Sequence, residues 1–215
     1  MPPPGPIITQ LLALLPEALK KTVVWRQFEA GMQIRDCKFE TCIRFGRRLY
    51  NPLSVNLRPF QPPDLEQVIG VYRAAIHTLA APFYTPEELS AWAPQHMDVD
   101  KWRQRLASVH AVVAEEDGTI AGFLTYDLTG HIDMLFIHPR FTRQGLATRL
   151  YLDTEAELRK APISTIFTEA SLAARPFFER HGFQVDAEEF SECRGQKLHR
   201  FRMSKKIGST WPAHI

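Results

Sequence analysis

The sequence predicts a mixed α/β (α+β) fold, in which one mostly antiparallel sheet carries helices on both faces. The apolar patterns run in the order strand, helices, three strands, helix, strand, helix and two strands. Asp117-Gly118 between two apolar runs predicts a tight antiparallel hairpin. The almost continuous apolar run from Ile163 to Thr168 is typical of a strand that is covered on both sides.

The individual elements follow from Ser54 onward. Val55 to Pro59 alternates like a strand, and its proline favours an edge or an end of the sheet. Apolar residues at three- and four-residue steps from Leu65 to Ile76 predict a helix with one buried face. Thr85-Pro86-Glu87-Glu88 reads as a capping box. The remaining expected elements are helices at 99–106, 144–160 and 173–180, and strands at 110–114, 120–126, 132–137, 163–168, 183–190 and 197–204.

Composition and charge distribution suggest how the chain is organised. We expect residues 1–53 to be a weakly structured basic extension, 54–207 to form one domain, and 208–215 to be a tail. The extension holds eight Lys/Arg against four Asp/Glu, yet the whole chain has a formal charge of only +2. That balance favours neither nucleic acid nor an anionic membrane as partner. Three scattered cysteines and no apolar run near the roughly 20 residues of a membrane span predict a cytoplasmic protein without a metal site.

The most informative stretch lies after the strand that ends at Ile137. Pro139 is followed by a short turn with Arg140, Arg143 and Gly145, and a helix begins at once. The first N–H groups of a helix have no intrahelical partner, and the helix dipole favours an anion beside them. This turn is therefore a candidate pyrophosphate site.

These residues, with a second motif downstream, resemble the GNAT N-acetyltransferase superfamily over about residues 54 to 206. Thr142 to Ala147 occupies the family's pyrophosphate loop, Gln/Arg-x-x-Gly-x-Gly/Ala. The later motif Asn-x-x-Ala-x-x-x-Tyr-x-x-x-Gly-Phe is matched at Ser171, Ala174, Phe178, Gly182 and Phe183. The run from Phe83 to Pro94 is similar to the acceptor-side helix pair of a bacterial, YafP-like branch.

The resemblance implies the GNAT acyl-CoA N-acyltransferase fold, with splayed parallel central strands, and acetyl-CoA as co-substrate. It assigns the pantetheine arm and one oxyanion-stabilising N–H to the backbone near Phe136 and Ile137. The expected coenzyme-binding residues are Leu135, Phe136, Ile137, Arg143, Gln144, Gly145, Leu146, Ala147, Thr148 and Phe178. Two positions depart from the family pattern: Thr142 replaces a Gln or Arg, and Phe178 replaces a tyrosine that many relatives use as a proton donor.

The family mechanism is direct attack by an amine, without an acyl-enzyme. An alkyl amine with a pKa of roughly 10 must lose a proton before it attacks. Asp133 is the candidate base, although the same carboxylate could merely orient the acceptor; His131 and His77 are the alternatives. Because Phe178 has no proton to give, the proton returns to the thiolate through water, Ser171 or another group, or its return is not needed; Ser171 is the candidate residue.

Three side chains are expected to bind the acceptor: Tyr84, Trp92 and His77. For the two aromatic residues, ordinary packing of the loop is the competing interpretation.

The sequence thus predicts an N-acetyltransferase that acts on a small-molecule or peptide amine, and the resemblance is compatible with a homodimer. Two other functions stay open. One is a catalytically silent acyl-CoA-binding sensor or partner module, which Thr142 and Phe178 favour slightly. The other is a nucleic-acid or partner-binding protein that carries the domain as a passenger, although its basic segment lacks interleaved aromatic residues.

Overall fold

The structure is a computed structural model that describes residues 55–208. The expected extension, residues 1–53, and all but the first residue of the expected tail, residues 208–215, lie outside the described part.

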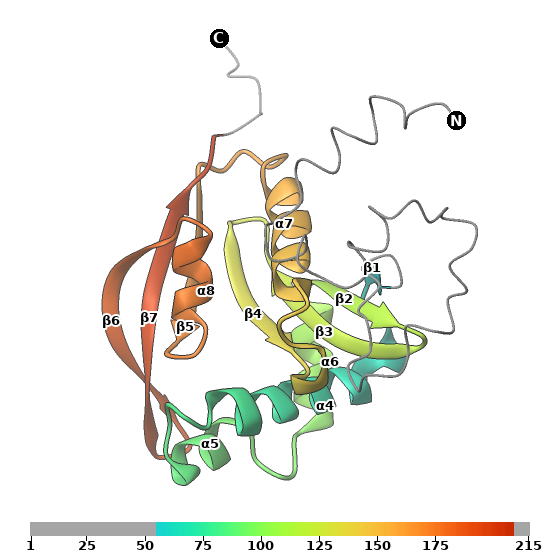
Figure 1. The fold of residues 1–215 in the computed structure, drawn as a ribbon, viewed down its shortest axis with the longest axis vertical. Helices are drawn as coiled ribbons and strands as arrows, with labels where there is room; N and C mark the ends of the chain where they lie inside the picture. The colour runs from blue at the N-terminus through green and yellow to red at the C-terminus, as the bar shows by residue number, and fades with distance from the viewer. Residues whose placement is uncertain (1–54, 209–215) are drawn as a thin grey trace, which may run out of the picture. The chain divides into compact units, whose positions relative to one another are not determined.

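The described residues form one seven-stranded sheet (Figure 1), in the order β1-β2-β3-β4-β5-β7-β6. All neighbouring strands are antiparallel except β4 and β5. The strands are β1 (Val55–Pro59), β2 (His110–Glu116), β3 (Thr119–Tyr126), β4 (His131–Ile137), β5 (Thr165–Ser171), β6 (Gln184–Cys193) and β7 (Gln196–Lys206). This confirms the mixed, mostly antiparallel sheet that the sequence predicts.

Helices connect the strands and cover both faces of the sheet. They are α4 (Leu65–Ala75), α5 (Pro86–Trp92), α6 (Val99–Ala107), α7 (Leu146–Leu158) and α8 (Arg175–Arg180). Short turns of other helix types are η3 (Pro62–Asp64), the π-helical turn η4 (Ile76–Ala80) and η5 (Pro139–Phe141). The predicted capping box of α5 is confirmed, because Thr85 and Glu88 each accept the other's backbone N–H, at 3.2 and 2.7 Å.

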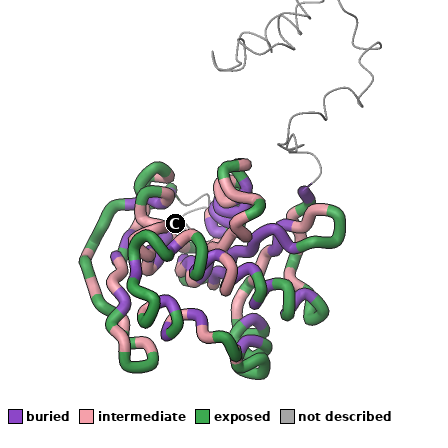
Figure 2. The backbone as a smooth tube through the Cα atoms, turned by 60° about the horizontal axis from the view of Figure 1, so that its bottom comes forward, coloured by how far each residue is buried: buried purple, intermediate pink, exposed green. Residues whose placement is uncertain are grey.

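The interior strand β3 shows why the sheet needs both helical layers. Every residue from Ile120 to Tyr126 is buried, because α4 packs on one face of this strand and α7 on the other. Buried segments accordingly gather toward the middle of the described residues, while exposed segments lie mostly around the outside (Figure 2), and the edge strand β6 has no buried residue.

The parallel pair β4–β5 holds together at only one end. Its register pairs only His131 with Phe167 and Ile132 with Thr168. The buried Thr168 hydroxyl fixes this end by donating to the Ile132 carbonyl at 2.8 Å. Beyond it the strands separate toward the side where α4 and α5 lie (Figure 1). The expected splayed parallel strands are therefore present.

Strand β4 carries a bulge at the point where it leaves β5. Thr125 of β3 pairs with Met134, but Tyr126 pairs with Ile132, so Asp133 has no partner in the register. A bulge of this kind bends the strand and redirects its side chains.

Most element boundaries lie one to three residues from the predicted ones, and two of these differences concern strands of the site. Strand β5 ends at Ser171 rather than Thr168, because antiparallel pairing with β7 continues to Ser171. Strands β6 and β7 extend to a two-residue turn at Arg194 and Gly195, both with positive φ (47° and 80°). Such turns match the twist of a hairpin, and they keep both strands paired to their ends.

Candidate active site

A cavity of about 350 Å³ lies where β4 and β5 have separated, and we call it the coenzyme-side cavity. Its walls come from η4, β4, α8 and the turn before α7. It is lined by Leu135, Phe136, Ile137, Arg143, Gly145, Leu146, Ala147 and Thr148, eight of the ten residues expected to bind the coenzyme. Gln144 is not among its lining residues, because its side chain turns back toward the Arg140 carbonyl at 3.4 Å.

The turn before α7 presents a concave row of backbone N–H groups. Arg143 and Gly145 both adopt positive φ, 60° and 76°, and Gly145 is the residue that caps the helix. Among residues 55–208, no protein acceptor is found for the N–H groups of residues 143–148, and the first bonded amide is that of Arg149, to Gly145 O at 3.0 Å. Alternating helical and left-handed backbone with free amides is the geometry of an anion-binding nest.

The edge of β4 that faces the gap also has unpaired backbone groups. His138 donates its N–H to Ala121 O of β3 at 2.9 Å. Because backbone groups alternate sides along a strand, the N–H groups of Ile137 and Leu135 then point away from β3, into the gap. Phe136 is directed the other way, since its carbonyl oxygen lies against Gly122 of β3.

Sequence reasoning missed several residues of the coenzyme-side cavity. They are Ala75, Ile76, Leu79, Ala80, Phe141, Ala173, Phe177 and Arg180. The helical period of α4 gave no sign that the chain widens into a π-helical turn at Ile76–Ala80. Such turns are often found at functional sites. Arg180 adds a second exposed cation beside Arg143, and it reaches the cavity because α8 follows β5.

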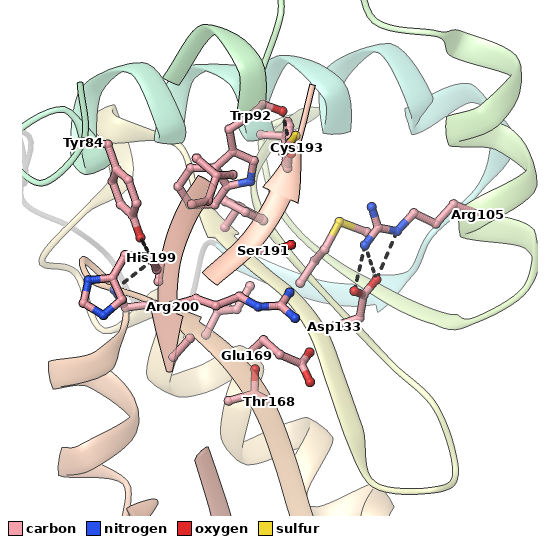
Figure 3. A pocket seen from close by; sticks show the side chains of 18 of the residues that line it. Tyr84, Trp92, Arg105, Asp133, Thr168, Glu169, Ser191, Cys193, His199 and Arg200 are labelled. Atoms are coloured by element: carbon pink, nitrogen blue, oxygen red, sulfur yellow. Dashed lines mark hydrogen bonds and ion pairs between the residues drawn. The ribbon is translucent and has the colours of Figure 1, made fainter. Parts of the chain in front are cut away.

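A second cavity, of about 430 Å³, adjoins the first, and we call it the acceptor-side cavity (Figure 3). Five residues line both: Trp92, Leu135, Phe136, Ser171 and Ala174. A molecule bound in one cavity can therefore contact a molecule bound in the other cavity at this shared boundary.

Asp133 lines the acceptor-side cavity two residues before the boundary residue Leu135. Both of its carboxylate oxygens accept hydrogen bonds from Arg105, at 2.7, 2.8 and 3.1 Å (Figure 3). Three hydrogen bonds leave about one of the four lone-pair positions of a carboxylate available. Arg105 thus fixes the orientation of Asp133.

A second carboxylate, Glu169, faces the same cavity from β5 and was not predicted. It lies two residues before Ser171, on the same face of the strand. His131 contacts its Oε2 at 2.7 Å and stacks on Phe167 with 4.8 Å between ring centroids. The hydrogen bond with Glu169 raises the pKa of His131, against its partial burial, and the same bond lowers the pKa of Glu169.

Tyr84 and Trp92 line the acceptor-side cavity, and both also pack into the protein. The Tyr84 hydroxyl donates to His199 O at 2.6 Å and accepts from Leu172 N at 3.0 Å. Burial raises the pKa of Tyr84, so its hydroxyl stays protonated as a donor. His77 is not among the residues that line this cavity; it is exposed, and its Nε2 contacts Ala93 O at 2.7 Å.

Ser171 and Phe178 lie at the start of the downstream motif. The Ser171 hydroxyl oxygen accepts from Ala174 N at 3.2 Å and caps the turn into α8, at the boundary of both cavities. Phe178 is buried and lines the acceptor-side cavity. The sequence analysis had expected it among the coenzyme-binding residues, but it does not line the coenzyme-side cavity. Its position on α8 directs the ring toward Phe183 rather than toward the turn before α7.

No helix within residues 55–208 is long and apolar enough to cross a membrane. No group of three or more His, Cys, Asp or Glu side chains in this range is arranged to hold a metal ion.

Comparisons with known proteins agree with this geometry. Residues 80–206 match the family model of the GNAT acetyltransferase domain. An N-acetyltransferase of Escherichia coli K12, YafP, is 34% identical over 156 residues, which cover 71% of this chain and 97% of that protein.

Solved structures show the same fold. A GCN5-related N-acetyltransferase from Rhodopseudomonas palustris is 28% identical, with a TM-score of 0.67 over 75% of this chain and 100% of the other. The PaiA N-acetyltransferase of Thermoplasma acidophilum, solved in complex with coenzyme A, is 21% identical, with a TM-score of 0.59 over 72% and 99%. With the family model and YafP, these matches identify the chain as a member of the GNAT acetyltransferase family, on the YafP-like branch.

Proposed function

We propose that this N-acetyltransferase binds acetyl-CoA in the coenzyme-side cavity and a small-molecule or peptide amine in the acceptor-side cavity. The observation that carries the proposal is the pair of adjoining cavities with five shared lining residues, one of them rimmed by free amides. A catalytically silent binding module has no need of a second polar cavity that opens on the first.

The residues of the coenzyme-side cavity fit the chemistry of the ligand. The N–H groups of residues 143–148 suit the pyrophosphate, and Arg143 and Arg180 add positive charge. The N–H groups of Leu135 and Ile137 suit the amide groups of the pantetheine arm, which would add a short strand to the free edge of β4. We assign this pairing to Leu135 and Ile137 and not to Phe136, because the backbone of Phe136 pairs with β3.

Acetyl-CoA supplies an acetyl group activated as a thioester. The protein holds the acceptor so that its nitrogen forms a bond to the carbonyl carbon while the carbon–sulfur bond breaks. An N–H of the free β4 edge donates to the carbonyl oxygen as negative charge gathers on it. The products are the N-acetylated amine and the free thiol, so one proton moves from nitrogen to sulfur.

We assign removal of that proton to Asp133. Its carboxylate lines the acceptor-side cavity, and Arg105 holds it in one orientation with a lone-pair position free. Phe178 has no proton to return to the sulfur. We propose that Ser171, which lies at the boundary of the cavities, relays a proton in that step: its hydroxyl donates to the sulfur while its oxygen takes a proton from solvent. Asp133 releases its own proton to solvent, so in balance one proton moves from nitrogen to sulfur.

The test is thiol release from acetyl-CoA against a panel of amines, amino acids, polyamines, aminoglycosides and peptides. Asp133→Asn should lower kcat by about 10²-fold or more with the best acceptor. Glu169→Gln serves as the comparison, because it removes another of the four carboxylates that line the same cavity, the others being Asp98, Asp133 and Glu192. A larger loss in Glu169→Gln would move the base from Asp133 to Glu169. Tight coenzyme binding without thiol release for any acceptor would contradict the proposed function.

We also propose that the protein works in the cytoplasm and that a homodimer is its assembly; size-exclusion chromatography with light scattering checks the latter.

A further inference from the structure

The acceptor-side cavity contains the guanidinium group of Arg200, whose terminal nitrogens make no hydrogen bond to the described residues. Four cationic side chains line this cavity: Lys101, Arg105, Arg194 and Arg200. Three have partners there, carboxylates for Lys101 and Arg105 and a backbone oxygen for Arg194. Arg200 Nε lies 2.7 Å from Glu189 Oε1, although out of line for a hydrogen bond. Among the described residues, no hydrogen-bond partner is found for its two terminal nitrogens.

Strand pairing places Arg200 beside the reaction centre. In the β5–β7 register Arg200 stands directly opposite Ser171, the residue shared by both cavities. Directly opposite side chains of an antiparallel pair lie on the same face. The guanidinium therefore projects from β7 into the acceptor-side cavity, in the direction of Asp133 and Glu169 (Figure 3).

Four carboxylates line the cavity, those of Asp98, Asp133, Glu169 and Glu192. The carboxylates of Asp133 and Glu169 lie toward β4 and β5, and the open end of the Arg200 guanidinium faces them from β7. The pKa of Glu169 is lowered mainly by its hydrogen bond with His131, and the positive charge of Arg200 adds to this lowering. No carboxylate among the described residues other than Glu189 lies at ion-pair distance from Arg200.

We propose that the acceptor carries a carboxylate as well as its amine, and that Arg200 binds this carboxylate. The inference rests on the proposed function and names the class of acceptor. Guanidinium nitrogens bind a carboxylate in a paired, planar arrangement, which fixes orientation as well as affinity. The amine of the same molecule would then face Asp133 and Glu169. An acceptor with a second cation, such as a polyamine, would meet like charge at Arg200.

The experiment offers each amine in two forms to the full-length protein. A set of amino acids and dipeptides is assayed as free carboxylates and as the matching carboxamides, which keep the amine and lose the negative charge. The carboxylate should have at least about tenfold higher kcat/KM, mostly through KM, because a charge-assisted hydrogen bond is lost in the carboxamide. This comparison in the wild-type protein does not depend on the folding of any variant.

Variants then test whether Arg200 causes the preference for the carboxylate form. Arg200→Gln should bring the ratio of carboxylate to carboxamide close to one, and Arg200→Lys should retain part of it. Arg202→Gln is the control: Arg202 is two residues further along β7, is exposed, and is not among the lining residues. It should keep the wild-type ratio.

The outcomes separate this inference from the proposed function. Thiol release with equal efficiency for both forms, or an Arg200→Gln variant that slows both forms alike, would overturn the role of Arg200 and leave the acetyltransferase intact. Absence of thiol release with every acceptor would overturn both.

Discussion

Two glycines make the coenzyme-binding turn testable with a matched control. Gly145 and Gly118 have nearly identical left-handed backbones, with φ of 76° and 75°. A Cβ built on either residue meets nothing within 4 Å. Substitution at either position therefore strains the backbone by the same amount and causes no clash inside the protein. They differ in place, since Gly145 begins α7 beside the free amides and Gly118 lies in the β2–β3 hairpin.

We expect Gly145→Glu and Gly118→Glu to lose similar stability and to differ in coenzyme binding. A residue other than glycine pays roughly 1–2 kcal/mol in this conformation. At about 2–4 °C per kcal/mol for a domain of this size, the melting temperature should fall by a similar few degrees in both variants. Only Gly145→Glu places a carboxylate beside the pyrophosphate, where like charges cost several kcal/mol, so coenzyme A should bind more than about 100-fold more weakly.

Thermal unfolding and isothermal titration calorimetry with coenzyme A measure both effects. Wild-type affinity in Gly145→Glu would refute the assignment of the turn to the pyrophosphate. An equal loss of affinity in Gly118→Glu would show that strain or destabilisation, and not position, causes the effect.

Further predictions concern the join between β4 and β5 and its charged neighbours. Thr168→Val removes the buried hydrogen bond to Ile132 O, and should lower the free energy of unfolding by about 1–2 kcal/mol in urea titrations. Thr154→Val is its control, because the buried Thr154 hydroxyl has no hydrogen-bond partner among residues 55–208, and it should be neutral or stabilising; equal losses would contradict the assigned role of Thr168. The pKa of His131 is raised above its ordinary value of 6.5, mainly by Glu169, so the pair stabilises the folded state fully below pH 6.5 and the gain is lost as pH rises through the folded pKa. His131→Gln should therefore flatten the dependence of unfolding free energy on pH above 6.5; an unchanged slope would show that other groups cause it.

The sequence could predict those parts that depend on local patterns. Glycine and proline positions, the capping box at Thr85 and the helical period after Leu65 each act within a few residues, and the corresponding elements are present. The turn before α7 was also recognisable, because its anion site consists of backbone groups whose positions follow from Pro139 and Gly145 alone.

The acceptor-side cavity was harder to predict from the sequence, because its residues come from distant segments of the chain. Arg105, Glu169 and Arg200 come from α6, β5 and β7, and only the sheet order brings them together. Arg200 lies opposite Ser171 because β7 inserts between β5 and β6, and no local sequence pattern predicts this strand order. His77 is the opposite case: it was expected to bind the acceptor, but it lies on an exposed helical surface outside the acceptor-side cavity.

The central claim is that the free amides of residues 143–148 hold the pyrophosphate of the coenzyme. Amide ¹H–¹⁵N spectra of the assigned protein, recorded during titration with coenzyme A, test it directly. The amides of Gly145, Leu146 and Ala147 should shift saturably, together with those of Leu135 and Ile137, while the amide of Gly118 stays in place. Coenzyme binding that leaves the amides of residues 143–148 unmoved would contradict the claim.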